Sequence, residues 1–394
     1  MAEVPEKKKK AGRIKIPDKV VNQLWARAAG RCQFRGCNDI LYSDDLTKLH
    51  DNLAVISHII AYEPNGPRGN PVDSFRLATD ISNLMLTCRK HGKIIDSIEH
   101  VPKYPVALLR EYKTEHEKRI KVLTGIQEDS KTHVLIFQAP IAGKTFHIDQ
   151  AHAFQAILPK YPADENAYII DLSDIPEKET GEGYWPFLSR IIKTKFDEIF
   201  NQGVKRREFN HISVFALAPI PLLVFLGNLI GDKRTVDLYQ RHLKTDDWKW
   251  KESPEELSEQ YYSLCGPEEH DPDAKTAVII SISSSVNKST VSAVMGDEYN
   301  CYELSVANPS RDFLSKRSKL KTFSYEYRRL LEILRTNNGH NKPIHLFCAV
   351  PAPVAIECGR LLLPKSDPPI MVYDFINDAG GYTCALAINR SSVE

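Results

Sequence analysis

The sequence lacks any long apolar run. A membrane-spanning helix needs roughly 20 consecutive apolar residues, and no segment of this 394-residue chain comes close. The first ten residues are mostly charged, which is unlike a secretory signal. We therefore expect a cytosolic protein that does not contact a membrane.

The sequence also lacks a regular cysteine framework. Its eight cysteines are unevenly spaced, and a chain without an export signal has little reason to form disulfides. We expect five of them to be small side chains without a function, namely Cys265, Cys301, Cys348, Cys358 and Cys384. The other three, Cys32, Cys37 and Cys88, lie in the polar N-terminal part and are candidates for metal binding.

The net charge of the chain is close to zero, but its charged residues are unevenly distributed. Residues Met1–Gly125 carry 22 Lys and Arg against 15 Asp and Glu, a net +7, and the remainder carries a net −6 from 30 against 36. A basic N-terminal part favours a polyanionic partner.

The chain is longer than a single hydrophobic core usually supports, so we expect two or three domains.

Two short pairs of metal-ligating residues stand far apart in the N-terminal part. A helix expected over Ile16–Gly30 leads to Cys32 and Cys37, and Cys88 and His91 follow downstream. Two such pairs suit tetrahedral zinc, whose four N and S ligands often come from two short loops. The alternative is a set of incidental cysteines with a surface histidine.

Between these pairs lie Val55-Ile-Ser-His58-Ile, the Gly66-Pro-Arg-Gly69 loop and Ser82-Asn83-Leu-Met-Leu-Thr-Cys88. In this order the elements resemble the HNH endonuclease family, and the resemblance runs from about Arg31 to Glu117. It implies a zinc-stapled ββα-metal (HNH) nuclease module over 16–125, preceded by a basic tail, 1–15, that we expect to be disordered.

The resemblance implies roles for individual residues. His58 would be the general base and Asn83 would brace its loop, because phosphodiester cleavage needs a base that titrates near neutral pH. Cys32, Cys37, Cys88 and His91 would hold structural zinc. The alternatives are that His58 is a core histidine and that His91 binds the catalytic cation.

One position departs from the family pattern. Many relatives have a histidine directly after the fourth zinc ligand, where this chain has Gly92. Asp96 lies one helical turn further on the same face, so we expect it to hold the catalytic Mg²⁺ or a similar divalent cation. An ordinary surface aspartate is the equal alternative.

The rest of the chain predicts a second α/β module. Residues 126–132 form the expected linker and 133–394 the module. Apolar β-branched runs separated by helices favour sheets covered on both faces. We expect strands at His133–Ala139, Ala167–Leu172, His211–Ala218, Thr235–Tyr239, Ala277–Ile282, Tyr299–Val306, Ile344–Val350, Ile370–Ile376 and Tyr382–Ile388.

This module contains an internal repeat. Phe215, Pro219, Pro221 and Gly227 recur 132 residues later as Phe347, Pro351, Pro353 and Gly359. Each copy then reaches a strand with a matching tyrosine, Tyr239 or Tyr373. The repeat predicts two Rossmann-like halves, at about 133–265 and 276–394, related by pseudo-symmetry.

The repeat resembles the SAVED domain, a fusion of two CARF-like units, and the whole chain resembles the HNH-SAVED effectors of bacterial cyclic-oligonucleotide antiphage systems (CBASS). This implies a bacterial cytoplasmic effector. A cyclic di- or trinucleotide would bind the second module, promote a homo-oligomer and release a nuclease that degrades double-stranded DNA.

Ligands of such folds lie beyond the carboxyl ends of the strands. By position, the candidates for cyclic-nucleotide binding are Pro140, Lys144, Pro219, Ser283, Ser284, Arg311 and Pro351. For Pro219 and Pro351 an ordinary place in the first turn of a helix is at least as good an interpretation.

Two other functions fit the same sequence. One is a modification-dependent HNH restriction endonuclease, which would cut modified DNA without a small molecule. The other is a non-catalytic, zinc-bearing DNA-binding protein, which the glycine at position 92 leaves open.

Overall fold

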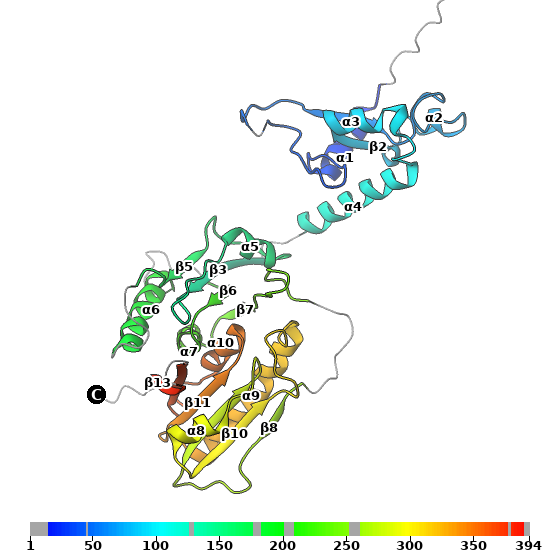
Figure 1. Ribbon diagram of the computed structural model, residues 1–394. Helices are drawn as coiled ribbons and strands as arrows, with labels where there is room; N and C mark the ends of the chain where they lie inside the picture. The colour runs from blue at the N-terminus through cyan, green and yellow to red at the C-terminus, as the bar shows by residue number, and fades with distance from the viewer. Residues whose placement is uncertain are drawn as a thin grey trace, which may run out of the picture. The chain divides into compact units, whose positions relative to one another are not determined.

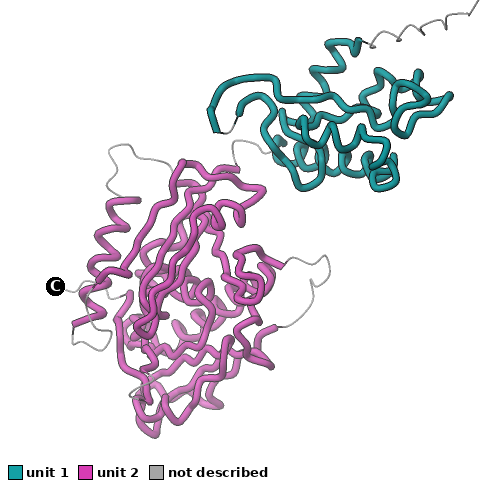
Figure 2. Tube along the Cα trace, turned by 45° about the horizontal axis from the view of Figure 1, so that its top comes forward, with its two compact units in different colours: residues 1–127 teal, residues 128–394 magenta. Residues whose placement is uncertain are grey.

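The computed structural model describes residues 15–44, 46–125, 130–175, 183–200, 209–251, 261–376 and 380–389. The chain divides into two compact units, residues 1–127 and 128–394 (Figure 2). The expected tail lies outside the described residues except for Lys15. Residues 126–129 of the expected linker also lie outside them. No described helix combines the length and apolar character needed to cross a membrane.

The first unit is a strand pair packed among helices. Its elements are α1 (Asp18–Ala28), β1 (Ala54–His58), α2 (Asp73–Arg76), the 3-10 turns η1 (Ile81–Asn83) and η2 (Ile98–His100), β2 (Leu84–Cys88), α3 (Arg89–Ile95) and α4 (Val106–Thr124). The strands β1 and β2 run antiparallel, with His58 opposite Leu84. The helix α3 begins directly after β2, which gives a strand–strand–helix arrangement.

The strand β2 is buried on both faces. Leu84 and Leu86 pack in one core cluster with Leu24 of α1, and Met85 belongs to another with Ile95 of α3. Such burial explains a continuous apolar strand in a small unit. The helix α1 ends at Ala28, and the following Gly30 has a φ of 65° and a close approach to the Tyr42 ring that suit only glycine.

The second unit contains two sheets. The first half has β3 (Lys131–Gln138), α5 (Gln150–Ala156), β4 (Tyr161–Pro162), β5 (Tyr168–Asp171), α6 (Tyr184–Phe200), β6 (His211–Leu217), α7 (Ile220–Ile230) and β7 (Thr235–Tyr239). The second half has β8 (Ser263–Cys265), β9 (Lys275–Ser281), α8 (Lys288–Met295), β10 (Tyr299–Ser305), α9 (Arg317–Asn338), β11 (Ile344–Ala349), α10 (Ala352–Arg360), β12 (Ile370–Ile376) and β13 (Gly381–Ile388).

The two halves share one topology. Parallel strands follow the order β7-β6-β3-β5 in the first and β12-β11-β9-β10 in the second. Antiparallel β13 and β8 extend the second sheet at its edges. All nine expected strands are present, with ends within two residues of those expected. The short strands β4 and β8 were not expected.

The repeated glycines lie where α7 and α10 cross between the sheets (Figure 1). A Cβ on Gly227 would be 1.9 Å from the Ile356 carbonyl oxygen, and one on Gly359 would be 1.8 Å from that of Val224. Val224 and Ile356 are also 132 residues apart. The two helix backbones therefore touch at a pseudo-symmetric point that admits only glycine.

The repeated aromatic residues also form equivalent pairs. Phe215 stacks on Tyr239 with ring centroids 4.4 Å apart, and Phe347 stacks on Tyr373 at 4.5 Å. In the second half His345 Nδ1 lies 2.9 Å from the Tyr373 hydroxyl. The first pair joins the adjacent strands β6 and β7, and the second joins β11 and β12. The repeat therefore preserves packing as well as topology.

An ion-pair network gives a second connection between the halves. The Asp237 carboxylate on β7 accepts from Lys160 Nζ at 2.9 Å and from Arg317 Nη1, at the start of α9, at 3.1 Å. Burial raises the pKa of this carboxyl, but His211, Lys160 and Arg317 outweigh it and hold the pKa well below its usual range. Asp237 therefore stays ionised and joined to the second half.

We expect Gly227→Ala or Gly359→Ala to destabilise the second unit by about 2 kcal/mol or more, because the helices have to separate to admit a methyl group. Denaturant unfolding of the full chain measures this, and Thr336→Ala on the exposed face of α9 is the control. Unchanged stability in the glycine variants would show that the helix contact is not a constraint.

Candidate functional site

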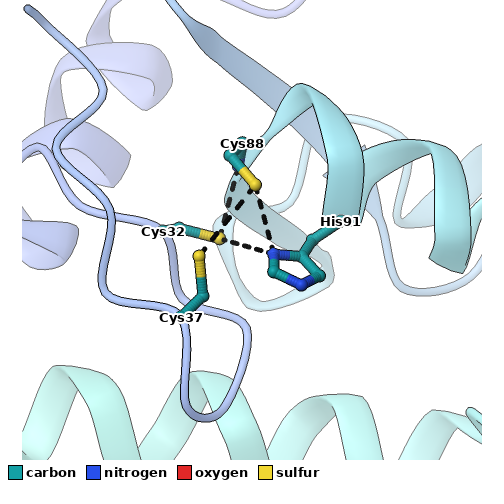
Figure 3. Close-up of side chains that lie close together, drawn as sticks. All are labelled: Cys32, Cys37, Cys88 and His91. Atoms are coloured by element: carbon teal, nitrogen blue, oxygen red, sulfur yellow. Dashed lines mark hydrogen bonds between the residues drawn. The ribbon is translucent and has the colours of Figure 1, made fainter. Parts of the chain in front are cut away.

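Four metal-ligating atoms converge in the first unit (Figure 3). The ligand atoms of Cys32, Cys37, Cys88 and His91 all lie within 4.8 Å of one another. Cys88 Sγ lies 3.1 Å and Cys32 Sγ 3.8 Å from His91 Nδ1, and the Cys37 and Cys88 sulfurs are 4.0 Å apart. A zinc tetrahedron has edges of roughly 3.6–3.8 Å, so a zinc ion fits this set.

Local structure brings each donor to this point. Cys32 follows the end of α1, and Gly36 at φ 81° lets the chain turn so that the Cys37 N–H donates to the Phe34 carbonyl. Cys88 ends β2 and His91 lies in the first turn of α3. The Phe34 ring stacks on His91 at 4.2 Å and holds the imidazole plane.

Metal binding by these four residues is linked to the protonation of their side chains. Burial raises the pKa of the Cys32 and Cys37 thiols and lowers that of His91. Thiolate is the form that binds zinc, so metal uptake has to release thiol protons and becomes weaker in acid. The predicted ligand set is therefore brought together and could hold a metal such as zinc.

His58 lies at the carboxyl end of β1. Its Nε2 is 2.8 Å from the Ala78 carbonyl oxygen. A carbonyl only accepts hydrogen bonds, so neutral His58 carries its proton on Nε2 and leaves Nδ1 free to accept one. The structure thus selects one tautomer of this histidine, and the other nitrogen has the form that a base requires.

Asn83 is fully buried and joins the segments around His58. Its Oδ1 accepts from the Ile60 N–H at 2.8 Å, and its Nδ2 donates to the carbonyls of Ile60 and Leu77. Leu77 directly precedes Ala78, the partner of His58. Asn83 therefore holds the peptide carbonyl next to the one that orients the imidazole.

Asp96 caps the end of α3 and interacts electrostatically with Arg68 and His58. Burial raises the pKa of Asp96, against the opposing charges of Arg68 and His58. Burial also lowers the pKa of Arg68, against the attraction of Asp96. Asp96 is nonetheless exposed, which agrees with the alternative of an ordinary surface aspartate.

Gly92 packs against both β1 and β2. A Cβ there would lie 3.0 Å from Thr87 Oγ1 and 3.1 Å from both Ser57 Oγ and Val55 Cγ1. The Ser57 and Thr87 hydroxyls hydrogen-bond to each other at 3.1 Å. A side chain at position 92 would therefore press on the β1–β2 pair.

Within the described ranges, the cysteine–histidine set is the one group of three or more metal-ligating side chains. Asp96 and His58 do not belong to such a group. The imidazoles of His100 and His116 are each hydrogen-bonded to a backbone carbonyl, of Ile94 and Ala28 respectively.

The second unit contains a cavity of about 870 Å³ at the carboxyl ends of its strands. The lining residues come from both halves: Pro140, Ile141, Ala142, Gly143, Leu172, Ile175, Tyr184, Leu188, Leu217, Ala218, Pro219, Ile220, Leu223, Cys348, Val350, Ala352, Tyr373, Asp374, Phe375 and Ile376. Most are apolar, and Asp374 is the charged residue among them.

The repeat itself builds part of this wall. Ala218 and Val350 are equivalent, as are Ile220 and Ala352, and all four line the cavity. The last two are the first residues of α7 and α10. Two helix N-termini, each with a partial positive charge, therefore reach the same space.

Only some of the seven residues predicted to bind a cyclic nucleotide line this cavity. Pro140 and Pro219 line the cavity, whereas its lining does not include Lys144, Ser283, Ser284, Arg311 or Pro351. Lys144 closes a tight turn with Ile141, and Pro351 caps α10 between two lining residues. Ser283 and Ser284 follow β9, an inner strand flanked by β11 and β10, and Arg311 is exposed.

Several lining residues were missed by the sequence reasoning. Tyr184 and Leu188 come from α6, which carries no part of the repeat, and Tyr373–Ile376 come from β12. A signal existed for β12, because its tyrosine belongs to the repeat. None existed for α6.

We expect one zinc ion per chain by elemental mass spectrometry, and its loss in Cys37→Ser and Cys88→Ser, with a lower unfolding temperature of the first unit. Cys265→Ser and Cys384→Ser alter exposed cysteines and should keep the metal. Full zinc content in Cys88→Ser would contradict this assignment.

Comparison with solved structures finds distant similarity. A Cap4 SAVED/CARF-domain containing receptor of Acinetobacter baumannii with the cyclic trinucleotide 3′3′3′-cAAA matches at 16% identity and a TM-score of 0.44, over 76% of this chain and 67% of that one. The same receptor with 2′3′3′-cAAA gives 15%, 0.44, 76% and 70%. The Moraxella osloensis Cap4 receptor gives 14%, 0.40, 75% and 60%.

Comparison with curated proteins gives no match. The family model SAVED, described as the SMODS-associated and fused to various effectors sensor domain, matches residues 192–388, half of the chain. This range contains α7, α10, the strands β6 and β7 of the first sheet and all the strands of the second sheet. The second unit thus confirms the resemblance inferred from the repeat, and the chain belongs to the SAVED family of sensor proteins.

Proposed function

We propose that this protein is a cyclic-oligonucleotide-activated, metal-dependent DNA endonuclease that acts as an antiphage effector. The observation that supports the sensing part is the cavity whose wall contains repeat-related pairs from the two halves, in a chain of the SAVED family. A ligand made of repeated nucleotide units matches a wall made of repeated structural units.

The cavity chemistry suits such a ligand. Tyr184 and Tyr373 offer aromatic faces to bases, and the apolar wall excludes water from them. The N-termini of α7 and α10 offer a favourable potential to phosphates. The volume of about 870 Å³ is near the upper end of ordinary ligand sites, which span about 300–1,000 Å³.

The proposal for the first unit is hydrolysis of a phosphodiester. Water attacks phosphorus, the bond to one bridging oxygen breaks, the water proton moves to His58 Nδ1 and the leaving oxygen takes a proton from solvent. The hydrogen bond from Nε2 to the Ala78 carbonyl supports this role, because it leaves Nδ1 unprotonated.

A divalent cation such as Mg²⁺, when bound, would neutralise charge on the phosphate. Asp96 is the residue that would hold it, since it is an exposed carboxylate that interacts electrostatically with His58. The four-donor set serves a different purpose, because its sulfur ligands suit zinc and not Mg²⁺.

A second candidate function is that of a SAVED sensor whose zinc-bearing unit binds DNA without cutting it. The packing of Gly92 against Ser57 and Thr87 favours it, because this leaves no side chain there to ligate a metal. A third, modification-dependent cutting, would need no cyclic nucleotide.

Plasmid cleavage in Mg²⁺ separates these functions. We expect the full chain to cut only with one member of a panel of cyclic di- and trinucleotides that includes 3′3′3′-cAAA and 2′3′3′-cAAA, and His58→Ala to lose at least 100-fold in rate. The control is His50→Ala, since His50 is exposed. Cutting without any activator, or no cutting under any condition, would overturn the proposal of a nuclease that needs an activator. Sedimentation of the protein with the activator would measure its assembly into an oligomer.

The cavity has its own test. We expect Ala352→Trp to fill the space beside the α10 N-terminus and weaken activator binding by about tenfold or more, because the indole takes the place of ligand atoms. Calorimetric titration measures the affinity. The control is Ala293→Trp on the exposed face of α8. Equal affinities in both variants would place the ligand elsewhere.

A further inference from the structure

The helix α3 carries three cations on one side. Arg89, Lys90 and Lys93 are exposed, whereas Gly92 and Ile95 on the opposite side are buried. Residues three and four apart are neighbours on a helix surface, so Lys93 lies beside both Arg89 and Lys90. These three residues form what we call the α3 cation face.

The α3 cation face is unpaired, unlike other exposed arginines of the first unit. Arg35 forms ion pairs with Glu111 and Glu115, and Arg76 forms one with Asp73. Within the part of the chain that the structure describes, no acidic side chain forms an ion pair with the α3 cation face. Ion pairing inside the protein therefore does not account for it.

A zinc ion held by the four-donor set would balance at most one of the three charges. Zinc brings two positive charges, and the thiolates of Cys32, Cys37 and Cys88 bring three negative ones. His91 binds zinc as a neutral imidazole. One negative charge then stands beside three cations, so a partner outside the first unit has to supply the rest.

The length and composition of α3 suit the backbone of a nucleic acid. The helix has seven residues and is about 10 Å long, and one DNA strand presents a phosphate about every 3.4 Å of its axis. Its apolar residues, Ile94 and Ile95, are half-buried and buried. Protein interfaces are depleted in lysine, and a membrane-binding helix needs an exposed apolar face, so a row of phosphates is the better partner.

The helix α3 is held in a fixed position on the strand pair. Cys88 directly precedes it, and its His91 points toward the three cysteines (Figure 3). On the buried side, a Cβ on Gly92 would lie 3.1 Å from Ser57 Oγ, and Ser57 directly precedes His58. The α3 cation face is therefore carried by a helix that packs against the strand ending at His58.

We propose that the α3 cation face binds the phosphate backbone of duplex DNA and positions it for cutting. This inference rests on the proposed function of the first unit as a DNA nuclease. Asp96, the exposed carboxylate proposed to hold Mg²⁺, is three residues from Lys93 and is its neighbour on the helix surface. A DNA strand that follows the cations passes this carboxylate, and phosphate contacts carry no base sequence.

The test is equilibrium binding of the full chain to labelled duplex DNA across a salt series, with Ca²⁺ in place of Mg²⁺ and with or without the cyclic-nucleotide panel. We expect the triple variant Arg89→Gln, Lys90→Gln, Lys93→Gln to lower the slope of log affinity against log salt by about 3, because each lost phosphate contact removes about 1. At about 0.1 M salt the affinity should fall by about 10²-fold or more. Two unrelated duplex sequences should behave alike.

The matched control removes the same charge elsewhere in the first unit. Lys19 on α1 and Lys118 and Lys121 on α4 are exposed, and their joint exchange for Gln should change the slope by less than about 1. An equal fall in both triple variants, or an unchanged slope in the α3 variant, would overturn the assignment to α3. A loss confined to one duplex sequence would mean base contacts and would contradict the proposal as well.

A single variant keeps the test independent of the zinc site, because Arg89 and Lys90 flank zinc ligands. Lys93→Gln alone should lower the slope by about 1, with zinc content and unfolding temperature unchanged. Lys93→Arg keeps the charge and should keep the slope of the unaltered protein.

The same measurements separate this proposal from the nuclease proposal. If no protein cuts DNA in Mg²⁺ but the slope still falls in the α3 variants, the nuclease proposal fails and the DNA-binding face of α3 stands. If the unaltered protein cuts DNA and the α3 variants keep its slope, the nuclease stands and the role of the α3 cation face is overturned.

Discussion

The contact between α7 and α10 is the constraint on which the second unit depends. Two helices whose backbones touch at Gly227 and Gly359 have almost no freedom to slide or separate. Both helices begin at the cavity and run from it to the crossing. The distance between their N-termini, and therefore the width of the cavity, is set by a packing contact away from the ligand. In a sensor built in this way, the two halves move together when a ligand binds, because neither half can move without the other.

The first unit depends on a comparable constraint of a different kind. Its core is small, and the four metal-ligating residues join the end of α1, the end of β2 and the start of α3. A zinc ion here would hold the end of β2 and the start of α3 against the loop after α1. The buried Asn83, directly before β2, donates to the Leu77 carbonyl, next to the Ala78 carbonyl that orients His58. The candidate zinc ligands and the support for the imidazole therefore lie at opposite ends of one strand.

Gly92 and Arg68 both lie against the end of β1. A Cβ on Gly92 would press on Val55, Ser57 and Thr87, and the Arg68 guanidinium donates to the carbonyls of His58 and Ile59. Asp96 interacts electrostatically with Arg68 and His58.

Sequence alone determined the features that depend on spacing and repetition. The positions of Cys32, Cys37, Cys88 and His91 predicted one cluster because zinc demands four close donors, and the offset of 132 residues predicted two equivalent halves because equal sequences pack equally. Tertiary structure decided what depends on the approach of distant segments. Examples are the role of α6 in the cavity wall, the exclusion of Lys144 and Arg311 from it, and the unpartnered nitrogen of Arg68. No local pattern encodes these, because each arises from the directions in which separately formed elements meet.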